Sequence, residues 1–152
     1  MKIVFMGTPE FAAGVLQYII SLHHNVVAVV TMPDKPSGRG QKITSSAVKN
    51  IAMEYNIPLL QPTNLKDEQF LKELSEFQAD LFLVIAFRML PKVVWNMPPK
   101  GTINLHASLL PQYRGAAPIN HVLINGEEIT GVTTFFINES IEHAGRRLVQ
   151  LD

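Results

Sequence analysis

The chain has 152 residues, a length that fits one folded domain, and 47% of them are hydrophobic, which is ample for a core. Its 13 basic and 13 acidic residues balance, which excludes a surface coated in one charge, so any polyanion must meet a local basic patch. The absence of cysteine excludes disulfides and thiolate metal sites. With no signal peptide and no apolar run near the ~20 residues of a membrane span, we expect a cytoplasmic protein that does not associate with a membrane. We also expect a monomer.

Short apolar runs alternate with helical patterns, which predicts a Rossmann-like α/β domain with an open, mainly parallel sheet and helices on both faces. The predicted strands are Lys2 to Met6, Asn25 to Thr31, Ile57 to Leu60, Leu81 to Ile85, Thr102 to His106 and Gly131 to Ile137. The predicted helices run from Pro9 to near Ser21, from a cap at Thr44 or Ser45, through Phe70 to Phe77, and over Val93 to Trp95. Between the second strand and the second helix, we expect a loop from Met32 to Lys42.

The fifth predicted strand carries two polar residues whose chemistry suits acyl transfer. Side chains alternate along a strand, so Asn104 and His106 share one face while Ile103 and Leu105 take the other. In open α/β sheets, ligands bind where strands end at their carboxyl termini. An amide there can donate to a developing oxyanion, and an imidazole can carry a proton. The spacing alone leaves open a plainer interpretation, in which both residues only cap the strand.

The sequence that continues from this strand, Asn104 to Gly115 and on through Asn120, resembles the signature of the formyltetrahydrofolate-dependent formyltransferases. The resemblance implies that Asn104 and His106 are catalytic together with an aspartate that comes later in the chain. It also implies 10-formyltetrahydrofolate as the co-substrate and no metal, and no metal-ligand spacing is seen in the sequence.

The family's aspartate stands in an Asp-Thr-Gly triplet, and here the corresponding stretch, Ile141 to Gly145, has no aspartate and has Glu142 as its nearest carboxylate. We therefore take Glu142 as a weak substitute for that catalytic carboxylate. Because the resemblance fades after Ile141, we expect residues 1–152 to form an incomplete amino-terminal catalytic domain. The resemblance further leads us to expect that the family's carboxy-terminal β-barrel domain is absent.

The resemblance also predicts which residues hold the folate. They are Phe87, Arg88, Met89 and Leu90 after the fourth strand, and Ser108, Leu109, Leu110 and Pro111 after the fifth. Arg88 departs from the family pattern, which usually has a smaller residue near this point, and we expect it to be only a surface charge.

Two further stretches resemble the branch of the family that formylates methionyl-initiator tRNA: the opening Ile3 to Ala12, and the basic loop from Thr31 to Lys42. The resemblance implies that Lys35, Arg39 and Lys42 in this loop approach the tRNA acceptor stem, where phosphate contacts would make binding salt-dependent. Taken by itself, such a basic loop is more often a solvated connection.

Several alternatives stay open. Another folate-dependent formyltransferase or hydrolase shares the fold, although the basic loop disfavours a sugar-nucleotide enzyme. A nicotinamide cofactor is disfavoured, because the glycine fingerprint of dinucleotide sites is missing after the first strand. The alternative from another class is an inactive fragment that binds folate or RNA without transferring a formyl group.

Overall fold

The computed structural model describes residues 1–108, 118–126, 131–139 and 147–149. The β-strands in these residues are β1 (Lys2–Gly7), β2 (Asn25–Val30), β3 (Lys35–Ser37), β4 (Lys42–Thr44), β5 (Leu59–Leu60), β6 (Leu81–Ile85), β7 (Thr102–His106), β8 (Val132–Phe136) and β9 (Arg147–Val149). The helices are α1 (Glu10–Ser21), α2 (Ala47–Glu54), α3 (Glu68–Glu76), α4 (Lys92–Trp95) and α5 (Pro118–Ile124).

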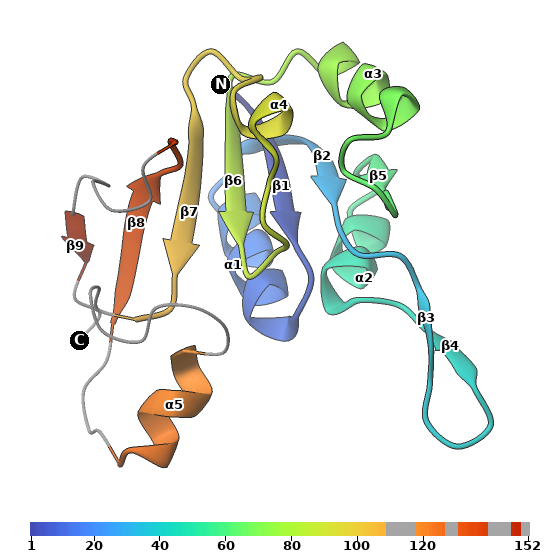
Figure 1. Cartoon of the computed structure of the whole chain (residues 1–152), viewed down its shortest axis with the longest axis vertical. Helices are drawn as coiled ribbons and strands as arrows, with labels where there is room; N and C mark the ends of the chain where they lie inside the picture. Colours follow the sequence, from blue (N-terminus) through green and yellow to red (C-terminus); the bar gives the residue numbers. More distant parts are fainter. Residues whose placement is uncertain (109–117, 127–130, 140–146, 150–152) are drawn as a thin grey trace.

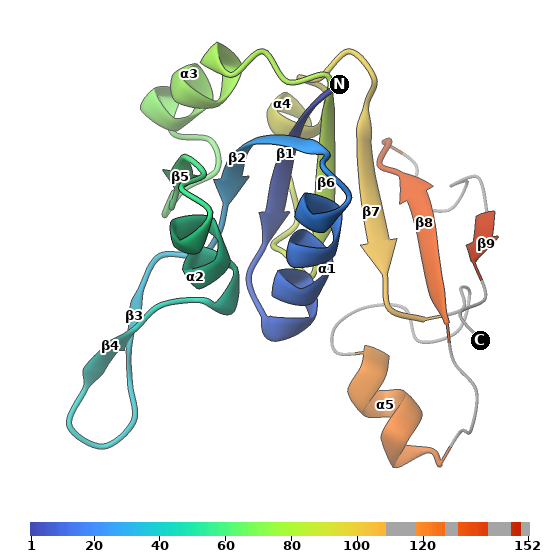
Figure 2. The same cartoon turned by 180° about the vertical axis from the view of Figure 1, so that it is seen from behind.

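Seven of the described strands form one sheet, in the order β5-β2-β1-β6-β7-β8-β9. The strands β5, β2, β1, β6 and β7 pair with their neighbours in parallel. Strand β8 pairs antiparallel with β7, and β9 pairs antiparallel with β8. The strand order reverses between β1 and β6, which is the topological switch point of a doubly wound sheet. The predicted Rossmann-like, mainly parallel sheet is therefore confirmed (Figures 1 and 2).

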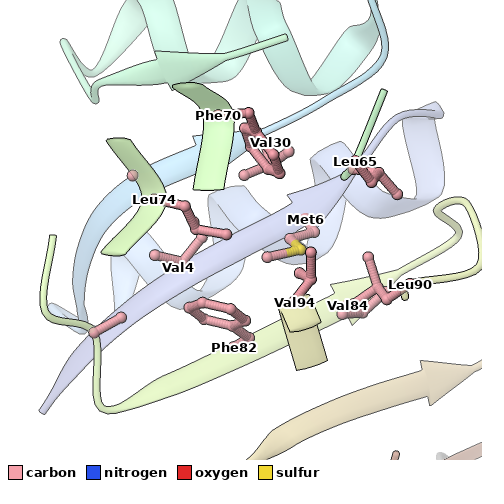
Figure 3. Close-up of a cluster of buried hydrophobic side chains, with 12 residues drawn as sticks. Val4, Met6, Val30, Leu65, Phe70, Leu74, Phe82, Val84, Leu90 and Val94 are labelled. Atoms are coloured by element: carbon pink, nitrogen blue, oxygen red, sulfur yellow. The ribbon is translucent and has the colours of Figure 1, made fainter. Parts of the chain in front are cut away.

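Two apolar layers hold helices against the opposite faces of the sheet. On one face, α1 and α2 pack in a cluster that includes Phe5, Leu16, Val29, Val48 and Ile85. On the other face, α3 and α4 pack in a second cluster, drawn in Figure 3, that includes Val4, Met6, Phe70, Leu74, Phe82, Val84, Leu90 and Val94. The central strands β1 and β6 contribute to both layers, because their side chains alternate between the two faces.

The segment between β2 and α2 differs from the prediction of a plain loop. It forms the β3–β4 hairpin, in which Lys35 pairs with Thr44 and Ser37 with Lys42. Gly38 and Gly40 adopt positive φ angles of 76° and 96° at the turn, a conformation that glycine adopts without strain. The chain can therefore reverse sharply enough for the two short strands to pair.

The predicted cap of the second helix is also wrong, by one or two residues. Thr44 ends β4, and the cap is Ser46, whose backbone is extended and whose Oγ accepts a hydrogen bond from the Lys49 amide at 3.0 Å. At α3, Asp67 caps in the same way and accepts from the Phe70 amide at 3.0 Å. The tail residues Arg147–Val149 form the strand β9.

Candidate functional site

Three neighbouring strands of the sheet end at the same edge and bring their following loops together. Strand β1 ends at Gly7, β6 at Ile85 and β7 at His106, and the three lie side by side in the sheet. In Figure 1 their arrowheads point to the lower edge, beyond which the β3–β4 hairpin and α5 project. This carboxyl edge contains the switch point and is the place where a ligand is expected.

Asn104 and His106 occupy the position on this edge that their alternation predicts. Asn104 pairs with Val84 of β6 and with Phe135 of β8. Val84 packs in the cluster under α3 and α4, so Asn104, its partner on β7, lies on that same face of the sheet. Leu105 instead packs on the opposite cluster, and both polar side chains are half-buried. The amide and the imidazole therefore share one face of β7.

The chain that leaves β7 is fixed to the neighbouring strand. Thr133, which pairs with His106, is buried, and its Oγ1 donates to the Ser108 carbonyl oxygen at 2.7 Å. Ser108 itself is fully buried. This hydrogen bond holds Ser108, the second residue after β7, against β8. The further folate-site predictions, Leu109, Leu110 and Pro111, lie outside the described residues, as does the predicted carboxylate Glu142.

The loop between β6 and α4 contains the other predicted folate residues. The pairing of β6 with β7 ends at Ile85, so the backbone that follows is not committed to the sheet. Phe87 is half-buried against the cluster under α3 and α4, whereas Met89 is 85% exposed. Leu90 turns inward beside Val84, as Figure 3 shows. The loop thus places an aromatic ring, and backbone that lies outside the strand pairing, beside the switch point.

Arg88 is not the solvated surface charge that we expected. Its Nη1 donates to the Thr63 carbonyl oxygen at 3.0 Å and its Nη2 to the Pro62 carbonyl oxygen at 2.7 Å. The guanidinium carbon lies 5.1 Å from the centroid of the Phe87 ring, within the range of a cation–π contact. Burial lowers the pKa of Arg88 below its usual value. The side chain therefore joins two loops of the carboxyl edge.

The three predicted tRNA-binding cations all lie on the β3–β4 hairpin and are exposed. The pairing register places Lys35 and Lys42 on one face of the hairpin, opposite Pro36 and Ile43, and Arg39 lies at its turn. Figures 1 and 2 agree that the hairpin extends away from the sheet at its carboxyl edge, on the side of β2 and β5. This arrangement makes the hairpin an exposed basic arm.

The base of this arm is held by residues that the sequence analysis did not single out. Asp34 accepts hydrogen bonds from the Lys49 Nζ at 2.6 Å and from the Gln61 Nε2 at 3.0 Å. These bonds, that of Lys49 first, lower the pKa of Asp34. Gln61 also donates to the Met32 carbonyl oxygen at 3.2 Å. The one signal in the sequence was that Gln61 follows a predicted strand directly and so lies at the same sheet edge.

Gly7 and Thr8 at the end of β1 are packed tightly against the same edge. A Cβ on Gly7 would lie 2.7 Å from the Ile85 carbonyl oxygen, so the glycine permits the close approach of β1 to β6. The Thr8 carbonyl accepts from the Val48 amide at 3.4 Å.

Across the described residues, no three His, Cys, Asp or Glu side chains gather as metal ligands would.

A family model described as "Formyl transferase" matches residues 1–151. The chain belongs to the formyl transferase family. It is 65% identical, over 93% of its length, to the methionyl-tRNA formyltransferase of Flavobacterium johnsoniae, and 61% identical over 93% to that of Bacteroides fragilis. The chain spans 45% and 44% of the length of these two relatives.

The fold agrees with this family. A crystal structure of phosphoribosylglycinamide formyltransferase from Bacillus halodurans matches 100% of the chain, and 81% of its own length, with a TM-score of 0.71. At 16% identity, this match shows the fold alone. The formyltransferase family predicted from Asn104 to Asn120 is confirmed by the family model that matches residues 1–151. In the part of the chain that the structure describes, no helix is long and apolar enough to span a membrane.

Proposed function

We propose that residues 1–152 belong to the amino-terminal catalytic domain of an enzyme that transfers a formyl group from 10-formyltetrahydrofolate to the α-amine of methionyl-initiator tRNA. The observation that carries this proposal is the placement of Asn104 and His106 on one face of β7 at the carboxyl edge of the sheet. The names of the two bacterial relatives described above support the choice of substrate. The proposed enzyme acts as a cytoplasmic monomer.

The residues present suit a flat, folate-type donor. Phe87 supplies an aromatic ring at the switch point, and the backbone after Ile85 has donors and acceptors that β6 does not use. Ser108, fixed by Thr133, begins the second segment proposed to enclose the donor. In this proposal Phe87 to Leu90 contact the donor ring, and Ser108 to Pro111 contact it from the β7 side.

In the proposed mechanism, the donor's formyl carbon lies beside the end of β7, where the α-amine of the methionyl group attacks it. The Asn104 amide donates to the oxygen on which negative charge develops, and the protonated His106 ring donates to the same oxygen. One such donor is worth about 10²–10³ in rate. Glu142 is retained as the proposed carboxylate that supports His106 and takes a proton from the attacking amine. The tetrahedral intermediate then collapses: its C=O bond re-forms, the bond from the formyl carbon to N10 of the folate breaks, and N10 leaves with the proton that the amine released.

The proposed acceptor is bound partly by the hairpin. Lys35, Arg39 and Lys42 form a local concentration of positive charge on a chain whose net charge is zero. The hydrogen bonds of Asp34 hold the base of the hairpin, and in this proposal they help to direct these cations toward the phosphates. Phosphate contacts of this kind give affinity that falls as salt rises.

The test is a formylation assay with charged initiator tRNA and 10-formyltetrahydrofolate. We expect Asn104→Ala to lower kcat by about 10²–10³-fold, because it removes an oxyanion donor. Asn50→Ala, which removes the same amide from the exposed surface of α2, is the matched control and should leave the rate unchanged.

Transfer at the wild-type rate in Asn104→Ala would refute the assigned chemistry. Donor binding without any transfer by the wild-type chain would instead favour the inactive, folate-binding alternative.

A further inference from the structure

The β6–α4 loop at the carboxyl edge is attached to a segment that lies far from it in the sheet. Arg88 belongs to this loop, and its two hydrogen-bond acceptors, the carbonyls of Pro62 and Thr63, follow β5. Strands β1 and β2 lie between β5 and β6 in the sheet. One side chain therefore connects loops whose strands do not touch.

We call this connection, from Arg88 to Pro62 and Thr63, the clamp, because it restricts the side chain more than a single hydrogen bond would. The planar guanidinium donates from two separate nitrogens to two consecutive carbonyls, which restricts its orientation as well as its distance. Its plane also lies near the Phe87 ring. The ion pairs seen in the described residues, Lys49 with Asp34 and Lys92 with Glu139, do not include Arg88. The partly buried guanidinium of Arg88 is instead held by two neutral carbonyls and an aromatic ring.

The loop held by this clamp has a conformation that needs support. Ala86, at its start, has a φ of 48°, in the left-handed region that residues with a Cβ seldom adopt. Such a conformation persists where the surrounding structure enforces it. Leu90 is buried in the cluster shown in Figure 3, and Phe87 is half-buried against the same cluster. Arg88 adds the hydrogen bonds that attach the loop to Pro62 and Thr63.

We propose that Arg88 is a positioning residue for the formyl donor: it clamps the Phe87–Leu90 loop to Pro62 and Thr63, so that the Phe87 ring and the loop backbone are in place before the donor binds. This inference rests on the proposed function, because it assumes that the loop contacts a folate-type ring. Arg88 itself acts through Phe87 and the loop backbone. The clamp lowers the conformational entropy that donor binding would otherwise have to remove.

The test compares Arg88→Met and Arg88→Lys with wild type by calorimetric titration of the full chain with 10-formyltetrahydrofolate. Arg88→Met removes both hydrogen bonds, and we expect donor binding at least about tenfold weaker, since hydrogen bonds from charged groups typically exceed the free energy of one tenfold step. Arg88→Lys keeps the charge but not the planar fork, so it should bind with an intermediate affinity. Lys92→Met, which removes an exposed cation at the start of α4, is the matched control and should bind as wild type does.

A second measurement reports the clamp without any ligand. Amide hydrogen exchange at Phe87 to Leu90 should be faster in both Arg88 variants, while exchange in β1 and β6 stays as in wild type. In a transfer assay, the KM for the donor should rise while the KM for methionyl-tRNA does not, a split that general destabilisation would not produce.

Wild-type donor affinity in either folded Arg88 variant, or unchanged exchange in the loop, would overturn the proposal. If Arg88→Met does not fold, the affinity and exchange of Arg88→Lys decide. Failure of the wild-type chain to bind the donor would overturn the proposed function, and with it the donor-positioning role. The exchange measurement would then separately report whether the clamp exists.

Discussion

The close contact between β1 and β6 at Gly7 leads to a prediction about folding stability. A methyl group on Gly7 would lie 2.7 Å from the Ile85 carbonyl oxygen, 2.8 Å from the Ala12 Cβ and 3.0 Å from the Phe5 Cε1. The Ile85 backbone is fixed in the parallel pairing with β7, and Ala12 and Phe5 are fully buried. None of these neighbours is the free end of a flexible side chain, so Gly7→Ala must shift a strand or a helix.

The magnitude follows from two opposing effects. Overpacking in a well-packed core typically costs about 1–3 kcal/mol. Replacing glycine by alanine returns about 0.5–1 kcal/mol, because the unfolded chain loses conformational freedom. We therefore expect Gly7→Ala to lower the free energy of unfolding by roughly 1–2 kcal/mol. For a chain of this size, that corresponds to a decrease in Tm of roughly 2–8 °C.

Gly14 provides the matched control for this experiment. It is exposed on α1, and a Cβ there would meet nothing within 4 Å. Gly14→Ala should therefore raise stability by about 0.5–1 kcal/mol, from helix propensity alone. Urea unfolding measures both variants. A Gly7→Ala protein that is as stable as wild type, or that gains as much as Gly14→Ala, would refute the steric reasoning.

Three further predictions concern the hairpin and a helix cap. Arg39→Ala should weaken tRNA binding and lower the slope of log affinity against log salt by about 1, and an unchanged slope in a binding titration would contradict the phosphate contact. Because the bond from Lys49 lowers the pKa of Asp34 below 3.8, the carboxylate contributes stability above this pH and loses it as the pH falls through the lowered value. The stability difference between wild type and Asp34→Asn should accordingly stay constant near neutral pH and shrink only in acid, and a difference that changes between pH values near neutrality would exclude this cause. Asp67→Ala should cost about 0.5–2 kcal/mol in urea unfolding, because the Phe70 amide loses its cap, and no change would show that water replaces the cap.

Much of the fold could be predicted from the sequence, because the central strands carry strong signals. Strands β6 and β7 were predicted residue for residue, since one is an unbroken apolar run and the other alternates polar and apolar residues. The shared face of Asn104 and His106 follows from alternation alone. Hairpin β3–β4 was missed because its strands are short and fully exposed, so no burial pattern marks them.

The clamp at Arg88 could not be predicted for a different reason. Its partners are backbone carbonyls 25 and 26 residues earlier in the chain. Every residue has a backbone carbonyl, so the sequence does not show which ones will accept a hydrogen bond from Arg88. The hydrogen bonds of Asp34 join side chains, but Asp34 follows β2, Lys49 lies in α2 and Gln61 follows β5. Only the folded arrangement of these three elements brings the side chains together. Contacts of this kind depend on the completed topology and not on local spacing.

The three residues from Gln61 to Thr63 look like an ordinary surface connection, of the sort that usually tolerates a longer or shorter chain. Their side chains and carbonyls, however, are fastened in two directions: Gln61 to the foot of the basic arm, and Pro62 with Thr63 to Arg88. One added or deleted residue here would disturb both attachments at once. Moving the arm into another member of the family would likewise require moving Lys49 and Gln61 with it, because residues outside the arm hold its base.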